Sequence, residues 1–154
     1  MKIRDVSINN RKKCIEIETA KGSYSLPFSR LRLIPTFSNK IANIFVDPEL
    51  ARECITYTLE SGVEDSVPLD AFLDYNREPE YMRKATLHNL TIQALELADN
   101  SKLSKREIAR KLKTSPAQLY RLLDTANYAK TIDTMLKLIS SLGYDFEIKL
   151  KKAG

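Results

Sequence analysis

The sequence predicts an α+β protein, in which a small antiparallel β-sheet over residues 1–78 is followed by a helix-turn-helix bundle over residues 79–154 that ends in a strand. Short runs of alternating apolar and polar residues fill the first part, as expected for half-buried strands. The second part carries helix caps and apolar residues at helical spacing. The charge divides similarly: residues 1–79 hold 11 Lys or Arg and 12 Asp or Glu, whereas residues 80–154 hold 14 and 8.

The strands of the first part are bounded by turn residues. The alternation around Ile15 and Ile17, with Glu16 and Glu18 facing water, predicts a hairpin through the Lys21-Gly22 turn. The same reasoning predicts further strands at Met1–Ile8, Ile41–Val46, Cys54–Leu59 and in a short piece that ends at Pro68. A short helix start then follows, and it should press three apolar side chains onto the sheet: Leu69, Phe72 and Leu73.

Three parts of this region resemble a small bacterial domain of unknown function that is sometimes joined to helix-turn-helix modules: the hairpin at Lys21-Gly22, the strand in "NIFVD" and the strand in "CITYTLESG". Tyr57 stands where that family often has tryptophan. The resemblance implies no activity. One alternative is a pocket for a small effector, although aromatic residues on strands are more often core. Its candidate lining is Tyr24, Phe28, Phe45 and Tyr57.

Residues 81–100 contain no helix breaker and predict one long helix that begins after Pro79. Apolar side chains occupy one face at helical spacing, namely Leu87, Leu90, Ala94, Leu97 and Ala98. Others lie toward a second face, namely Ala85, Ile92 and Leu95. Because this apolar surface exceeds a single stripe, we expect the sheet or a second copy of the chain to cover the second face.

Leu103–Leu123 predicts two short helices joined by a tight turn. Ser104 and Glu107 form a capping box, so the first helix should begin near Lys105 and end by about Lys111. Ser115 is an N-cap and Pro116 suits the first helical position, which predicts a second helix over residues 116–123. A steep crossing of the two helices would bury their apolar residues, which are Ile108, Ala109, Leu112, Leu119, Leu122 and Leu123.

Five residues follow one pattern: the small residue Ala109, the apolar Leu112, the turn residue Lys113, the N-cap Ser115 and the apolar Leu119. This pattern resembles the helix-turn-helix of the phage-repressor (Cro and lambda-repressor-like) family. The resemblance extends from about Thr86 to Gly143, where Thr131 caps and Gly143 ends a last helix. Lys113 stands where the family usually has a left-handed glycine, which costs on the order of 1 kcal/mol. The resemblance implies a sequence-specific protein that binds double-stranded DNA and regulates transcription. An α-hairpin without any nucleic-acid partner remains open.

If the second helix enters a major groove, its outer face reads the bases. Arg121 is the first candidate because a guanidinium can donate two hydrogen bonds to guanine, and Gln118 and Ala117 are secondary. Tyr120 could reach a phosphate, whereas Pro116 replaces a glutamine that the family frequently uses. The resemblance places phosphate contacts at Thr114, Ser115, Lys105, Arg106, Asn127, Tyr128 and Lys130. We expect Arg121→Ala to relax preference at one base pair, and Lys105→Ala to weaken binding to all sequences.

The apolar residues of Tyr144–Leu150 alternate with charged ones, which predicts a strand with one apolar face. Because the amides of a lone strand need a partner, we expect it to join the first sheet or to pair with the same strand of a second subunit. A homodimer is also expected because single helix-turn-helix modules bind DNA weakly.

Other functional classes are disfavoured. An enzyme is not expected, because His88 is the only histidine and because the sequence holds no glycine-rich phosphate loop or metal-ligand spacing; we expect no cofactor. Cys14 and Cys54 are interpreted as reduced packing thiols, with a disulfide left open. No run approaches the roughly 20 apolar residues of a membrane span, so we expect a cytoplasmic protein without a membrane partner. The alternative function is an antitoxin that represses its own operon and binds a toxin.

Overall fold

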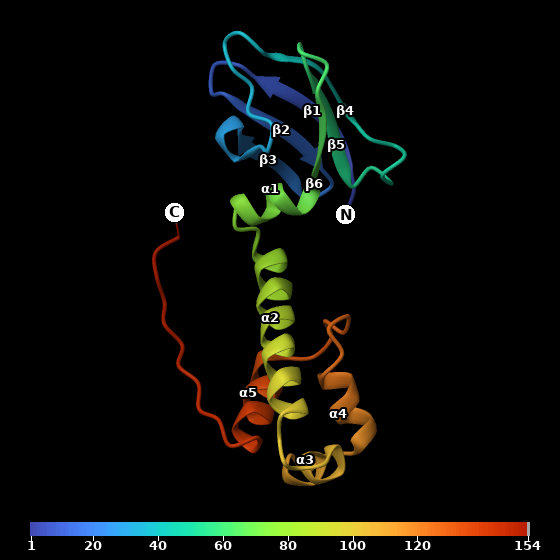
Figure 1. Cartoon of the computed structure of the whole chain (residues 1–154), viewed down its shortest axis with the longest axis vertical. Coiled ribbons are helices and arrows are strands. Elements are labelled where there is room, and N and C mark those ends of the chain that lie inside the picture. Colours follow the sequence, from blue (N-terminus) through green and yellow to red (C-terminus); the bar gives the residue numbers. More distant parts are fainter. Residues whose placement is uncertain (154) are drawn as a thin grey trace. The chain divides into compact units, whose positions relative to one another are not determined.

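The computed structural model describes residues 1–153 and confirms the α+β class (Figure 1). The chain divides into two compact units, which we call the sheet unit (residues 1–81) and the helical unit (from Met82 onward). In chain order the elements are β1 (Ile3–Asn9), β2 (Cys14–Thr19), β3 (Gly22–Pro27), η1 (Phe28–Arg30), β4 (Ile41–Val46), β5 (Cys54–Leu59), β6 (Glu64–Pro68), α1 (Leu69–Tyr75), α2 (Pro79–Asp99), α3 (Lys105–Lys111), α4 (Pro116–Leu122) and α5 (Ile132–Ser141).

The sheet unit contains two antiparallel three-stranded sheets, β1-β2-β3 and β4-β5-β6, rather than the single sheet expected. The strand positions follow the alternation in the sequence, but the alternation does not say which strand edges pair. The long connection between β3 and β4 is not a hairpin, so the second group of strands forms its own ladder. The two sheets meet at β1, where the Ile3 amide donates to the carbonyl oxygen of Arg52 at 2.9 Å.

One apolar core joins both sheets and α1. Ile15 and Ile17 are fully buried and Glu18 is exposed, as the alternation predicts, whereas Glu16 is half-buried and accepts from the Asn9 side-chain amide at 2.9 Å. Tyr57 and Phe72 are fully buried in the same cluster. The prediction that a short helix presses its apolar residues onto the strands is confirmed, since α1 contacts β3 and β6 and its three buried residues are Leu69, Phe72 and Leu73.

The helical unit has a separate core to which α2, α3, α4 and α5 all contribute. Its fully or almost fully buried members are Leu87, Ala94, Ala98, Ile108, Ala109, Leu119, Met135 and Leu138. Thr91 is buried among them because its hydroxyl donates to the Leu87 carbonyl at 2.6 Å, which satisfies the polar group within the helix. On the second face of α2, Ile92 stays partly exposed and Leu95 packs against the core.

The strand predicted for residues 144–150 is absent from the structure. These residues follow α5 as an extended red segment in Figure 1, and no strand within residues 1–153 pairs with them. An alternating pattern supplies one apolar face but not the second set of backbone groups that a ladder needs. The prediction that this segment joins the first sheet was wrong, and its pairing with the same strand of a second subunit stays a prediction.

Candidate nucleic-acid interface

Helix α3 begins and ends where its caps predict. The Ser104 hydroxyl oxygen accepts from the Glu107 amide at 3.2 Å and donates to the Glu107 carboxylate at 3.2 Å. The carboxylate therefore reaches the Ser104 hydroxyl, whereas in a capping box it usually reaches the backbone amide. Helix α3 then presents Ile108 and Ala109, both buried, to the core.

The turn after α3 explains how a lysine occupies the expected glycine position. Lys113 has φ of 58°, the left-handed conformation that the family resemblance implies. Its amide donates to the Arg110 carbonyl at 3.1 Å, and the Thr114 amide donates to the Ala109 carbonyl at 2.9 Å. These two bonds form a Schellman motif, which satisfies the carbonyls at the end of the helix. The motif offsets the cost of a left-handed lysine and redirects the chain sharply into α4.

Helix α4 is capped independently. The Ser115 hydroxyl accepts from the Gln118 amide at 3.2 Å, and Pro116 occupies the first helical position. The helix ends at Leu122, one residue before the predicted end, with Leu123 as its C-cap. Leu119 is fully buried, and α4 packs against α3 across the short turn (Figure 1). Ala109, only 1% exposed, allows this close approach because its side chain is small.

The outer face of α4 is open to solvent in the single chain. Ala117, Gln118 and Arg121 are all exposed, and the Tyr120 ring is more than half exposed. The Asn127 side-chain amide donates to the Arg121 carbonyl at 3.0 Å, so the loop after α4 holds the end of this helix. The predicted base-reading residues thus lie together on one accessible helical surface.

Some of the residues predicted to contact phosphates are exposed, whereas others already bond to groups within the chain. Arg106 and Ser115 are exposed, although the Ser115 hydroxyl already caps α4. The Lys105 ammonium lies 2.7 Å from the Asp99 carboxylate, which reduces the positive charge that it offers. Thr114 is half-buried. Tyr128 is fixed against α2, because its carbonyl accepts from Arg83 at 3.2 Å and Lys84 lies over its ring.

Lys130 is a structural residue. It is 8% exposed, and its ammonium donates to the carbonyls of Leu122 at 2.9 Å and Asp124 at 2.8 Å. A cation at the C-terminal end of a helix satisfies the free carbonyls there and is favoured by the helix dipole. Burial lowers the pKa of this ammonium, while Asp124 opposes the shift. The predicted phosphate contact at Lys130 is incompatible with this geometry.

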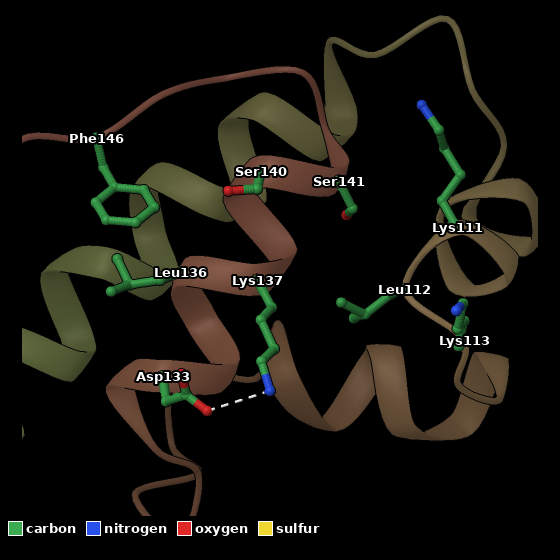
Figure 2. A pocket seen from close by; sticks show the side chains of 9 residues that line it. All are labelled: Lys111, Leu112, Lys113, Asp133, Leu136, Lys137, Ser140, Ser141 and Phe146. Carbon is green, nitrogen blue, oxygen red and sulfur yellow. Dashed lines mark ion pairs between the residues drawn. The ribbon is translucent and has the colours of Figure 1, made fainter.

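Lys111 and Lys113 were missed as candidate phosphate contacts. They line a shallow surface hollow of about 550 Å³ together with Leu112, Leu136 and Lys137 (Figure 2). Figure 2 shows Lys137 turned toward Asp133, and the two charged groups lie 3.3 Å apart. Lys111 and Lys113 are exposed and add positive charge beside the turn that precedes α4. Their place next to the capped turn was the signal that could have identified them.

The other sites considered from sequence find less support. Tyr57 is fully buried, and its hydroxyl donates to the Leu33 carbonyl at 2.9 Å. Tyr24 and Phe28 pack against the same core and Phe45 is partly exposed, so three of the four aromatic residues of the candidate lining belong to the core. Cys14 and Cys54 are free thiols, and burial raises the pKa of both. Within residues 1–153, no group of three or more His, Cys, Asp or Glu side chains is placed to hold a metal ion, and no helix has the length and apolar character needed to cross a membrane.

Residues 104–123 therefore form two capped helices that pack against each other and leave one face of α4 exposed. This geometry alone is shared by proteins with different functions. Its distinguishing features are the exposed polar face of α4 and the basic residues around the turn. Comparison of the chain with protein-family models, with curated proteins and with solved structures found no match, so these residues and their geometry carry the functional argument by themselves.

Proposed function

We propose that this protein binds double-stranded DNA in a sequence-specific way, as a bacterial transcriptional regulator that places α4 in the major groove. The observation that carries the proposal is the exposed outer face of a helix that a capped, left-handed turn holds against α3. A helix with its side chains is about 10–12 Å wide, and the major groove is about 12 Å wide, so the groove accepts such an element.

Arg121 is the proposed base-reading residue. It is exposed, and its position in the last turn of α4 leaves the guanidinium free of the buried face that Leu119 occupies. A bidentate contact to guanine contributes about 1–3 kcal/mol of discrimination against the wrong base. Gln118 and Ala117 lie on the same exposed face and are proposed to contact neighbouring base edges.

Phosphate contacts are proposed at Arg106, which is exposed at the start of α3, and at Lys111 and Lys113, which are exposed beside the turn after α3. Lys105 contributes less because of its ion pair with Asp99. Residues 80–154 carry a net charge of +6, from 14 basic and 8 acidic residues. Neutralised phosphates release counterions, so the affinity should fall steeply as salt rises.

Selection from a random pool of duplex DNA with the full chain tests this proposal. We expect enrichment of one short motif, and an affinity for that motif that falls linearly with salt on logarithmic axes. A scrambled duplex of equal length and composition is the matched control and should bind more weakly. Equal and salt-insensitive binding to both duplexes would overturn the proposal.

An antitoxin is the second candidate, because the sheet unit exposes apolar side chains between β3 and β4. Phe37 is almost fully exposed and Ile34 about half exposed, as in surfaces that bind another protein. Co-expression with the product of the adjacent gene tests this function. Relief of growth arrest by the native chain, and its loss with Phe37→Ser, would support an antitoxin; no growth arrest by that product would exclude this pairing.

A further inference from the structure

The segment 144–152 after α5 exposes apolar side chains that the described chain covers only in part, at Phe146. Tyr144, Phe146, Ile148 and Leu150 are 52%, 43%, 67% and 95% exposed. They alternate with charged residues, so in a β-strand these four side chains would share one side of the backbone. No strand in residues 1–153 pairs with the segment, which leaves a backbone edge ready to form a ladder with another chain.

The charged side of this segment has an ordered sequence of signs. Asp145 and Glu147 come first, and Lys149 and Lys151 follow. The Glu147 carboxylate and the Lys149 ammonium lie 3.5 Å apart, which places both side chains on the same side of the backbone. The acidic end and the basic end therefore make the segment complementary to its own reverse.

We propose that residues 144–152 of two copies of this chain pair as an antiparallel ribbon whose two-fold axis passes through Ile148. In this register Asp145 faces Lys151 and Glu147 faces Lys149, and symmetry produces each contact twice. Phe146 faces Leu150 on the apolar side, and Ile148 faces its own copy. Opposite charges and apolar side chains directly across an antiparallel pair both stabilise it.

Other pairings of the same two segments are less favourable. A parallel in-register pair sets every charge opposite an identical charge. Antiparallel pairs centred on Glu147 or Lys149 place two like charges at the axis. A shift by one residue moves the apolar side chains to the charged side. Charge complementarity thus selects a second copy of the chain, and it selects the register as well.

The helical unit itself supplies a surface for the apolar side of the ribbon. Phe146 lines the same hollow as Leu136 of α5 and Leu112, and Figure 2 shows its ring directed toward Leu136. An isolated two-stranded ribbon is marginal in water and gains stability when a helix covers one face. Residues of α5 can provide that cover in each copy. The ribbon does not depend on the proposed DNA binding.

A charge-exchange experiment tests the ribbon in the full chain without DNA. Glu147→Lys sets lysines opposite each other, and Lys149→Glu sets glutamates opposite each other, so each variant should dimerise at least about tenfold more weakly than the native chain. An equimolar mixture of the two variants restores both opposite-charge contacts and should recover the dimer. Both positions are largely exposed, so neither substitution disturbs a core. Sedimentation velocity measures the association.

Cysteine cross-linking tests the register. Ile148→Cys places two thiols opposite each other at the axis, within the Cα separation that a disulfide spans, and oxidation should link two chains through this position. Leu150→Cys is the matched control and should not link, because it faces Phe146 instead of itself. Mass spectrometry distinguishes these links from any formed by Cys54, which is partly buried.

A native chain that stays monomeric at all concentrations would overturn the ribbon. Dimerisation that both single charge variants retain at native strength would also overturn it, because the dimer would then use another surface. Recovery only in the mixture, together with linking at position 148 and not at 150, is the result expected. Since no measurement involves DNA, failure here leaves the proposed function standing.

Discussion

The two units use their polar side chains in different ways. In the sheet unit several join distant parts of the chain: Arg32 donates to Asp65 at 2.7 Å, and the Asn76 side-chain amide donates to the Ser25 carbonyl at 2.7 Å. In the helical unit α3 and α4 are instead capped locally, by Ser104 and Ser115, and longer-range bonds such as that from Arg83 to the Tyr128 carbonyl at 3.2 Å lie outside these two helices. Local caps stabilise short helices without using the outer face of α4. That unit can therefore hold a fixed shape and still present polar groups to a partner.

The largest predicted effects come from the two separate cores. Phe72→Ala should destabilise the sheet unit by about 3–5 kcal/mol, and Leu119→Ala should destabilise the helical unit by about 2–5 kcal/mol, because both side chains are fully buried. Hydrogen exchange resolved along the chain measures both effects. Each substitution should lower amide protection in its own unit and leave the other unit unchanged.

Each of these variants serves as the control for the other. Loss of protection in both units after either substitution would show that the two cores unfold as one. The two units would then not be separate in stability, whatever the difference in their hydrogen bonds.

Lys130→Met should have an intermediate effect on the helical unit. It keeps an apolar side chain but removes the ammonium that bonds to the Leu122 and Asp124 carbonyls. Hydrogen bonds to charged groups contribute about 1.5–3 kcal/mol, so we expect a loss of that order in unfolding free energy. Urea denaturation measures it. The slope of DNA affinity against salt should stay native, and a slope reduced by about one would instead make Lys130 a phosphate contact.

The smallest predicted effect is a pH dependence in the sheet unit. The hydrogen bond from Arg32 lowers the pKa of Asp65, although burial opposes this. A carboxyl whose pKa is lower in the folded state stabilises the fold above its unfolded-state pKa, and this contribution disappears as pH falls through the folded-state pKa. Because Arg32 is largely exposed, we expect less than about 1 kcal/mol.

Denaturation of the native chain and of Asp65→Asn at pH 7 and near pH 3 checks this dependence. At pH 7 the native chain should be more stable than Asp65→Asn, and this difference in stability should shrink near pH 3. An equal difference in unfolding free energy between the two chains at both pH values would show that the Arg32–Asp65 contact does not stabilise the sheet unit.

Features predicted correctly from the sequence depend on nearby residues. The caps at Ser104, Ser115 and Thr131 each act within a few positions, and alternation marks a strand locally. Features that were missed depend on the path of the chain. The burial of Lys130 follows from how its loop returns to α4, and the division into two sheets follows from which edges meet.

The 144–150 segment also shows that a local sequence pattern does not determine which strands pair. Its alternation predicts one apolar face, but strand formation requires a second strand, and no strand of the described chain pairs with this segment. The exposed face of α4 could be identified from sequence because α-helical spacing fixes which residues oppose Leu119.

The most direct measurement compares Arg121→Ala with Arg106→Ala on the selected duplex and on a library of its single-base variants, at two salt concentrations. Arg121→Ala should cost about 1–3 kcal/mol on the selected duplex and abolish the preference at one base pair. Arg106→Ala should weaken binding to every duplex alike and reduce the salt slope by about one. Native preference and native affinity in the Arg121 variant would contradict the placement of α4 in the major groove.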